Sequence, residues 1–238
     1  MSTDRRDFLQ RLTLGSVAFG ALPSSLRAEP VPAEARAGSW REEWSALQQQ
    51  PASAAFDTSW TAKLTGKYRA VFDVPEIEGG SGVWRAGLWI NHYTDVLKAG
   101  PSDLNAVVVI RHAAIPLLMS NEFWEAYDVA KSRKVMHPIT DKKTRRNPVL
   151  MTAADDQLPP MLANITLAKQ IEKGAIVLGC NMAFAQIVGM VAKKEKLNMG
   201  EARTKALSMM TPGVILQPNG IFGVTLAQHH GAAFVAAV

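Results

Sequence analysis

The single cysteine of this 238-residue chain, Cys180, directly follows a short apolar run and directly precedes a helical pattern. The run Ala175–Leu178 has the continuous apolar character of a strand buried on both faces of a sheet. In open α/β sheets, ligands bind at the carboxyl ends of the strands. The first backbone N–H groups of a following helix favour the thiolate form of a cysteine placed there. Cys180 therefore has the position of a reactive thiol, and the alternative is an inert cysteine that packs as a small apolar side chain.

One histidine and four amide side chains follow or flank other predicted elements. His112 closely follows the apolar run Leu104–Ile110, so it could reach the same sheet edge as base or hydrogen-bond partner of Cys180. A purely structural histidine is the alternative. The amide side chains that could line a ligand are Asn147, Asn181, Gln217 and Asn219. Each of these four is also an ordinary turn or helix-cap residue.

The sequence offers no pattern for a metal site or a nucleotide cofactor. His229 and His230 are adjacent in a helical pattern, so their side chains diverge, and His92 and His137 have no acids at ligand spacing. The glycine fingerprints of dinucleotide and ATP sites are absent after the first strand. We therefore predict neither metal nor cofactor. A single cysteine also excludes an intramolecular disulfide.

Strand-like and helix-like patterns alternate along the second part of the chain. The predicted strands are Tyr68–Val74, Leu104–Ile110, Ala175–Leu178, Val214–Leu216 and an edge strand at Phe234–Val238. The predicted helices are Val83–Ala99, Ile115–Ala130, Asp155–Lys173, Met182–Lys196, Gly200–Met209 and Gly220–His230. Apolar strands separated by helices favour an α/β fold, with a mostly parallel sheet and helices on both faces.

The positive charge of the chain is concentrated in one segment. The formal net charge is +5, and residues 131–146 hold seven lysines and arginines against the single acid Asp141. The rest of the chain is therefore close to neutral, which speaks against a nucleic-acid-binding face. We interpret 131–146 as an inserted basic loop. It is either solvated surface or a contact for an anion or an acidic partner.

The first thirty-three residues have the pattern of an export signal. Arg5 and Arg6 precede Asp7-Phe8-Leu9, and the weakly apolar stretch Leu12–Leu22 follows. This order is typical of a twin-arginine signal peptide, here residues 1–33, with cleavage after Ala33 or, second, after Ala28. The alternative is an amphipathic helix with a chance pair of arginines. The signal predicts recognition by the twin-arginine export machinery and a periplasmic or otherwise exported protein.

Residues 34–61 separate the predicted signal from the first strand. They are rich in Ala, Ser, Gln and Pro and contain Trp40, Trp44 and Trp60. We predict a linker with a short helix around Trp40–Gln49 that docks through its tryptophans. No apolar run reaches the roughly 20 residues that a membrane span requires, so we predict no transmembrane segment in the mature protein.

Four local motifs, taken in order, resemble the DsrE/DsrF-like family. They are the strand 107–110 ending in Arg111-His112-Ala113, the pair Asn147-Pro148, the strand 174–181 ending in Cys180-Asn181, and Pro212–Gly220 followed by a Gln-containing terminal helix. The resemblance covers about 130 residues, from Asn105 to the end of the chain. The chain departs from the family by its export signal and its basic loop.

The resemblance implies a DsrE-like, flavodoxin-like three-layer domain over residues 62–238. It also implies that Cys180 carries sulfur as a persulfide, receives it from a donor protein or passes it to an acceptor, and that the protein forms a homo-oligomer. The protein would then be a sulfur carrier or sulfur-binding protein rather than a turnover enzyme. The competing interpretation is a non-catalytic ligand-binding or assembly module of the same fold, with a buried, inert Cys180.

Overall fold

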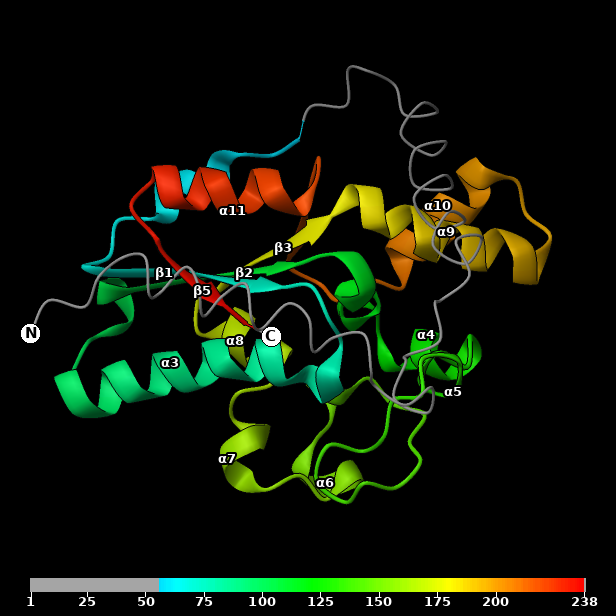
Figure 1. The fold of residues 1–238 in the computed structure, drawn as a ribbon, viewed down its shortest axis with the longest axis horizontal. Helices are drawn as coiled ribbons and strands as arrows, with labels where there is room; N and C mark the ends of the chain where they lie inside the picture. Colours follow the sequence, from blue (N-terminus) through cyan, green and yellow to red (C-terminus); the bar gives the residue numbers. More distant parts are fainter. Residues whose placement is uncertain (1–55, 238) are drawn as a thin grey trace, which may run out of the picture. The chain divides into compact units, whose positions relative to one another are not determined.

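Five parallel strands form the centre of the computed structural model, which describes residues 56–237. The strands are β1 (Tyr68–Val74), β2 (Leu104–Ile110), β3 (Ile176–Cys180), β4 (Val214–Gln217) and β5 (Ala233–Ala236). Their order in the sheet is β4-β3-β2-β1-β5, and every neighbouring pair is parallel (Figure 1). The predicted α/β fold is confirmed, and the described sheet is entirely rather than mostly parallel.

Two predictions from the sequence concern mainly residues that the structure does not describe. The predicted signal peptide of residues 1–33 and the predicted helix at Trp40–Gln49 lie outside the described residues. The end of the predicted linker is described. There, a 3₁₀ helix at Ser59–Lys63 buries Trp60, which is 1% exposed, against side chains of the sheet.

One face of the sheet carries the thicker layer of helices. Phe72 and Val108, at alternate positions of their strands, pack against α3 (Ser81–Leu97) and α9 (Asn181–Glu195) in one apolar core. The helix α10 (Met199–Ser208) packs beside α9 and extends this layer outward. The glycine Gly87 lets α3 approach its neighbours, because a Cβ there would lie 2.5 Å from Ile165 Cβ.

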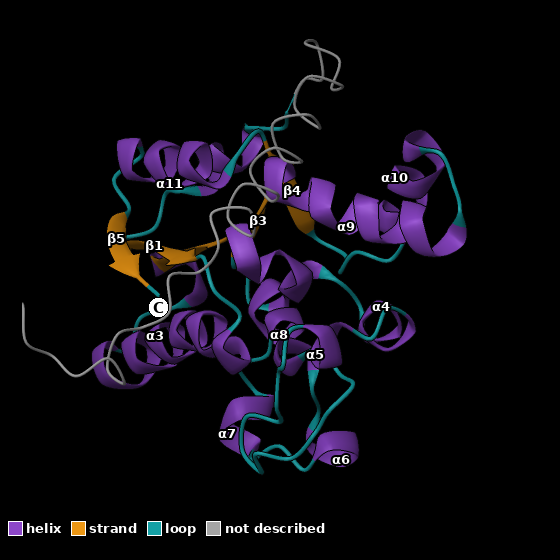
Figure 2. Cartoon of the chain, turned by 45° about the vertical axis from the view of Figure 1, so that its right-hand side comes forward, coloured by secondary structure: helices purple, strands orange, loops and turns teal. Residues whose placement is uncertain are grey.

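The opposite face is covered by α11 (Gly220–His229). Val109 and Leu178 point to this side and form a second core with Val224 of α11 and with Trp60. Figures 1 and 2 show α11 on one side of the strands and α3 and α8 on the other. The arrangement is a flavodoxin-like three-layer fold, as predicted.

The segment predicted as one helix at Ile115–Ala130 is instead broken into three pieces. These are a 3₁₀ helix at His112–Leu118, α4 (Asn121–Ala126) and α5 (Val129–Ser132). The chain is extended at Ser120, whose hydroxyl caps α4 by accepting the N–H of Phe123. Asp128, with φ +50°, then separates α4 from α5. Side-chain capping therefore outweighs the continuous apolar pattern.

The helix predicted at Asp155–Lys173 is also divided. The structure has α6 (Ala153–Asp156), α7 (Pro160–Ala163) and α8 (Leu167–Glu172). Pro159 and Pro160 cannot continue a helix from α6, and Thr166 starts α8 by capping the N–H of Lys169. Gly174, with φ +91°, follows α8 and confirms the predicted stop.

The basic segment 131–146 is largely a loop, as predicted. Its first two residues complete α5, and Met136 pairs with Lys143 in an isolated antiparallel bridge. His137 is bonded at both ring nitrogens, with Nε2 2.8 Å from the Asp156 carbonyl oxygen and Nδ1 accepting from the backbone N–H of Ile139. These bonds tie the loop to the segment around α6.

The connections after β3 and β4 diverge at the carboxyl edge of the sheet. The chain leaves β3 into α9 on the thicker side, whereas it leaves β4 into α11 on the opposite side. Adjacent strands with diverging connections create the crevice where open α/β sheets bind ligands. Cys180 and Gln217, the last residues of these two strands, are paired across it.

Candidate functional site

Cys180 ends β3 and at the same time caps α9. Its Sγ accepts a hydrogen bond from the backbone N–H of Ala183 at 3.4 Å, within the first turn of that helix. The residue is 6% exposed. The predicted position of Cys180, between an apolar strand and a helix of fifteen residues, is confirmed. A thiolate there would gain from the partial positive charge at the start of α9.

Three residues lie at the same level of three neighbouring strands. Register pairs the residue before Arg111 with the residue before Cys180, and pairs Cys180 with Gln217. Arg111, Cys180 and Gln217 therefore form a row along the carboxyl edge. The side chain of Arg111 passes beneath the first turn of α11, because a Cβ at Gly220 would lie 2.5 Å from Arg111 Cδ.

Arg111 is held by a bidentate ion pair. Its Nε and one terminal nitrogen donate to the two carboxylate oxygens of Asp73 in β1, at 2.6 and 2.8 Å. This hydrogen bonding raises the pKa of Arg111 above its usual value, and the nearby Cys180 adds a smaller contribution in the same direction. Arg111 is thus a positive charge fixed by Asp73, at the strand end next to that of Cys180.

Gln217 is 1% exposed, and only the nitrogen of its side-chain amide forms hydrogen bonds. Its Nε2 donates to the backbone carbonyls of Asp57 at 2.7 Å and Leu216 at 3.1 Å. Its Oε1 is buried and has no hydrogen-bond partner. A buried acceptor without a donor is costly, so Oε1 is a place where a polar group would be favoured.

Asn219 and Asn181 occupy helix starts. Asn219 caps α11, with its Oδ1 accepting the N–H of Phe222 at 2.8 Å. Asn181 is buried, and its Oδ1 accepts from a terminal nitrogen of Arg203 at 2.8 Å. Burial lowers the pKa of Arg203, which also lies over the ring of Phe184. Both asparagines flank the row at Cys180, and a role in lining a ligand remains a prediction.

His112 and Asn147 have other partners. The imidazole of His112 is exposed, and its Nδ1 lies 3.5 Å from a carboxylate oxygen of Glu76. Asn147 is fully buried, and its Nδ2 donates to the carbonyls of Leu117 and Met119 at 2.9 and 2.7 Å. The hydrogen bonds of Asn147 therefore have a structural role. His112 lies beside Glu76. Arg111, next to His112 in sequence, lies in the row with Cys180.

Arg111 and Asp73 were not among the predicted site residues. A local signal was present for each, because Arg111 directly follows an apolar strand and Asp73 interrupts one. A charged residue in or at the end of a buried parallel strand needs a partner. From either residue, an oppositely charged partner elsewhere in the sheet could therefore have been predicted.

The fold and the site define a flavodoxin-like three-layer α/β domain with a cysteine at the carboxyl edge of its sheet. No protein-family description, no curated protein and no solved structure matches this chain. Among residues 56–237, no helix has the length and apolar character needed to cross a membrane. Within the same range, no three His, Cys, Asp or Glu side chains gather as a metal site would require.

Proposed function

We propose that this protein is an exported, DsrE-like sulfur carrier that holds sulfur on Cys180 as a persulfide. The observation that carries the proposal is the Cys180 Sγ, which accepts an N–H bond at the start of α9, with the guanidinium of Arg111 fixed at the neighbouring strand end. The nucleophile in sulfur transfer is a thiolate, and reactive protein thiols are typically found at helix starts and beside basic side chains. The resemblance of the flanking motifs to DsrE/DsrF-like proteins adds support.

The transfer needs no added oxidant. The Cys180 thiolate attacks the outer, sulfane sulfur of a donor persulfide, forming a new S–S bond while the donor S–S bond breaks. The donor leaves as a thiolate, and Cys180 holds the persulfide. An acceptor thiolate then attacks the outer sulfur in the same way and releases the Cys180 thiolate. The partners are therefore a sulfur-donor and a sulfur-acceptor protein, each with a reactive thiol.

The location of this carrier follows from the amino-terminal pattern. Arg5 and Arg6 with the following apolar stretch support delivery to the periplasm by the twin-arginine machinery, which exports folded proteins. A carrier that folds before export arrives with its cysteine already placed at the sheet edge. By the same resemblance we propose a homo-oligomer.

A second function is favoured by one specific observation. Cys180 is 6% exposed and already serves as the cap of α9, so it also fits a structural role. On this interpretation the protein is a non-catalytic ligand-binding or assembly module of the same fold. The thiol would then be inert in the folded state.

Mass spectrometry after incubation with polysulfide separates the two functions. A carrier gains the mass of added sulfur, the gain disappears in Cys180→Ser, and dithiothreitol removes it. An inert cysteine gives no adduct in the folded protein, although the same sample reacts once unfolded in urea. Iodoacetamide alkylation near neutral pH provides a second readout, because a carrier thiol reacts at least as fast as a model thiol.

A further inference from the structure

The two edge strands of the sheet, β4 and β5, differ in how well their outer sides are protected. β4 is flanked by Pro212 and Pro218, which have no N–H to donate, and its residues are buried or half-buried. β5 is exposed at three of its four residues and contains no proline, glycine or charged residue. Edge strands are normally protected by prolines, charges or covering segments, because their free backbone groups pair readily with another chain. Apart from its short length, β5 has none of these protections.

The hydrogen bonds between β5 and β1 use only one side of the β5 backbone. Ala237, directly after β5, donates its N–H to the carbonyl oxygen of Asp73 in β1 at 3.0 Å. Backbone groups alternate in direction along a strand, so every second residue before Ala237 also faces β1. Phe234 and Ala236 therefore direct their N–H and C=O groups away from the sheet. Within residues 56–237, no other strand lies on that side.

The side chains of this open edge are apolar on both faces of the sheet. Phe234 is 48% exposed and lies on the face that α11 covers, because its register partner Val71 belongs to the core on that face. On the other face, Val235 is half-buried and is paired in register with Phe72. The ring of Phe72 in turn contacts Trp89 of α3, with 6.0 Å between the centroids. β5 thus offers free hydrogen-bonding groups between apolar side chains, which is the surface that an added strand requires.

The described part of the chain begins at the edge of the sheet that lies farthest from β5. The carbonyl oxygen of Asp57 accepts a hydrogen bond from the side-chain nitrogen of Gln217, the last residue of β4, at 2.7 Å. β4 and β5 stand at opposite ends of the strand order, about 19 Å apart by strand spacing (Figure 2). The segment that leads into the domain is therefore held at the other edge, and a second molecule is the better source of a strand for β5.

We propose that β5 pairs antiparallel with β5 of a second copy of this chain, so that the two sheets become one across a twofold axis. The register that uses all the outward groups places Phe234 opposite Ala236 of the second copy, and Val235 opposite its own counterpart. Phe234 and Ala236 then exchange N–H···O=C bonds, and the same exchange recurs across the axis. The strand is self-complementary, because the small Ala236 leaves room for the Phe234 ring and no like charges meet.

The assembly closes at two copies. Once β5 is paired, the edges that remain in the described sheet are the two β4 strands, whose flanking prolines disfavour further pairing. The inference gives an interface to the homo-oligomer and in that respect rests on the proposed function. It does not depend on the sulfur chemistry, because β2 and β1 separate β5 from Cys180 at the end of β3. Formation of a persulfide can therefore succeed or fail independently of the dimer.

Analytical ultracentrifugation of the full chain over a range of concentrations tests the pairing. We expect a dimer of twice the chain mass of 25.8 kDa. Ala236→Pro removes an outward N–H without removing a bond to β1, so it raises the dissociation constant of the dimer at least about tenfold. Ala236→Ser keeps this N–H and is the matched control, with an unchanged dissociation constant. Circular dichroism and urea unfolding establish that each variant is folded.

A second variant keeps the test decisive if proline disturbs the strand. Phe234→Lys brings like charges together at the twofold axis and removes an apolar contact, so it also raises the dissociation constant at least about tenfold. Ile221→Lys is the matched control, because Ile221 is 67% exposed at the start of α11, next to the β4 edge. This control leaves the dimer unchanged.

Amide hydrogen exchange identifies what pairs with β5. In the dimer the N–H groups of Phe234 and Ala236 exchange slowly, and they exchange faster when dilution separates the copies. Slow exchange of both groups in a monomer would mean that another part of this chain occupies the edge, and it would overturn the proposal. A dimer that persists unchanged in Ala236→Pro and Phe234→Lys would overturn this interface alone. A parent chain that is monomeric at about 0.1 mM would overturn the homo-oligomer as well, whereas sulfur addition to Cys180 is measured separately.

Discussion

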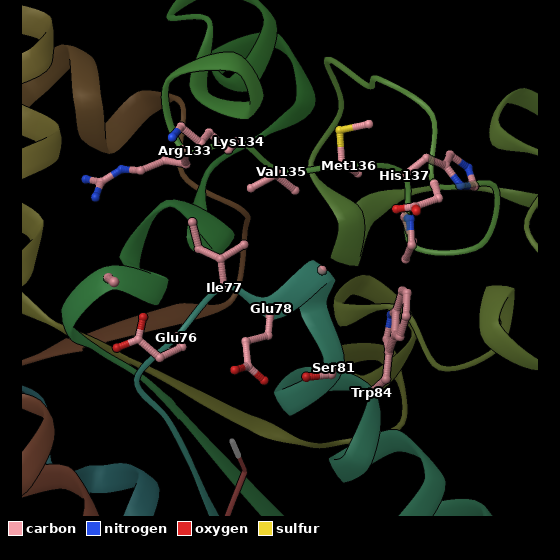
Figure 3. A pocket seen from close by; sticks show the side chains of 14 residues that line it. Glu76, Ile77, Glu78, Ser81, Trp84, Arg133, Lys134, Val135, Met136 and His137 are labelled. Atoms are coloured by element: carbon pink, nitrogen blue, oxygen red, sulfur yellow. The ribbon is translucent and has the colours of Figure 1, made fainter. Parts of the chain in front are cut away.

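Two regions at the carboxyl edge of one sheet differ in how their polar groups are used. In the row at Cys180, the charges are already paired within the protein, as Arg111 is with Asp73. In the cavity of about 880 Å³ between the turn before α3 and the basic loop, Glu78 and Lys134 belong to the lining (Figure 3) and form no ion pair with any described residue. Paired groups stabilise the fold, whereas unpaired groups that face a cavity remain available to a ligand.

The difference follows from the elements that carry the residues. Arg111, Cys180 and Gln217 stand at strand ends, where sheet register fixes their distance to one another. Glu78 begins a 3₁₀ turn, Glu78–Gly80, and Lys134 lies in the turn after α5, both in the left-handed region with φ +32° and +55°. Loops accept such backbone conformations and hold side chains apart from the hydrogen-bonded framework. The comparison predicts that substitutions in the row lower the stability of the fold and that substitutions of the two cavity charges leave it almost unchanged.

The largest effect is expected from breaking the Arg111–Asp73 pair. Asp73→Ala leaves a partly buried guanidinium without its bidentate partner, and we expect it to lower the free energy of unfolding by about 2 to 3 kcal/mol. Urea unfolding followed by circular dichroism measures the change. Asp95→Ala, on the exposed side of α3, is the matched control and remains near the parent.

A double variant tests whether pairing is the cause. Asp73→Ala combined with Arg111→Met removes both charges, so it is more stable than the sum of the two single effects predicts. Additive losses would contradict the paired description of this row.

The next largest effect concerns the close approach of α11 to Arg111. Gly220→Ala places a Cβ 2.5 to 3.1 Å from three carbons of the Arg111 side chain, so we expect a loss of about 1 to 2 kcal/mol in unfolding free energy. Gly189→Ala, in the middle of α9, is the control because its Cβ meets nothing within 4 Å. That control gains up to about 1 kcal/mol from helix propensity. A stabilising Gly220→Ala would show that α11 is not closely packed on the row.

The sequence predicted the position of Cys180 because its signals are local. An apolar run before it and a helical pattern after it define a strand end and a helix start, and both lie within a few residues. All five strands were predicted for the same reason. The Arg111–Asp73 pair lies 38 residues apart in sequence, so only the alignment of β1 with β2 brings its members together.

The two broken helices were mispredicted because apolar periodicity does not record helix stops. Ser120 and Thr166 each cap the start of a new helix. The spacing of apolar residues stays the same on both sides of such a cap, so it gives no sign of the break. The cavity could not be predicted at all. Its walls come from the turn before α3 and from the basic loop, and the meeting of two loops depends on how the surrounding helices pack.

A smaller effect is expected at the helix cap formed by Cys180. Cys180→Ala removes the acceptor of the Ala183 N–H and some packing, so it lowers the unfolding free energy by about 1 kcal/mol, whereas Cys180→Ser keeps an acceptor and loses less. Thermal and urea unfolding of both variants measure the difference. If Ala and Ser substitutions have equal effects, the cap contributes nothing and the Cys180 sulfur is free of this structural role.

The smallest effect is expected for the cavity charges in the absence of a ligand. Glu78→Gln and Lys134→Gln remove charges that have no partner, so each changes the unfolding free energy by less than about 0.5 kcal/mol. Arg111→Met, measured in the same buffer, gives the scale of a paired charge. A loss above about 1 kcal/mol for either cavity variant would mean that its charge contributes to folding through an interaction in solution.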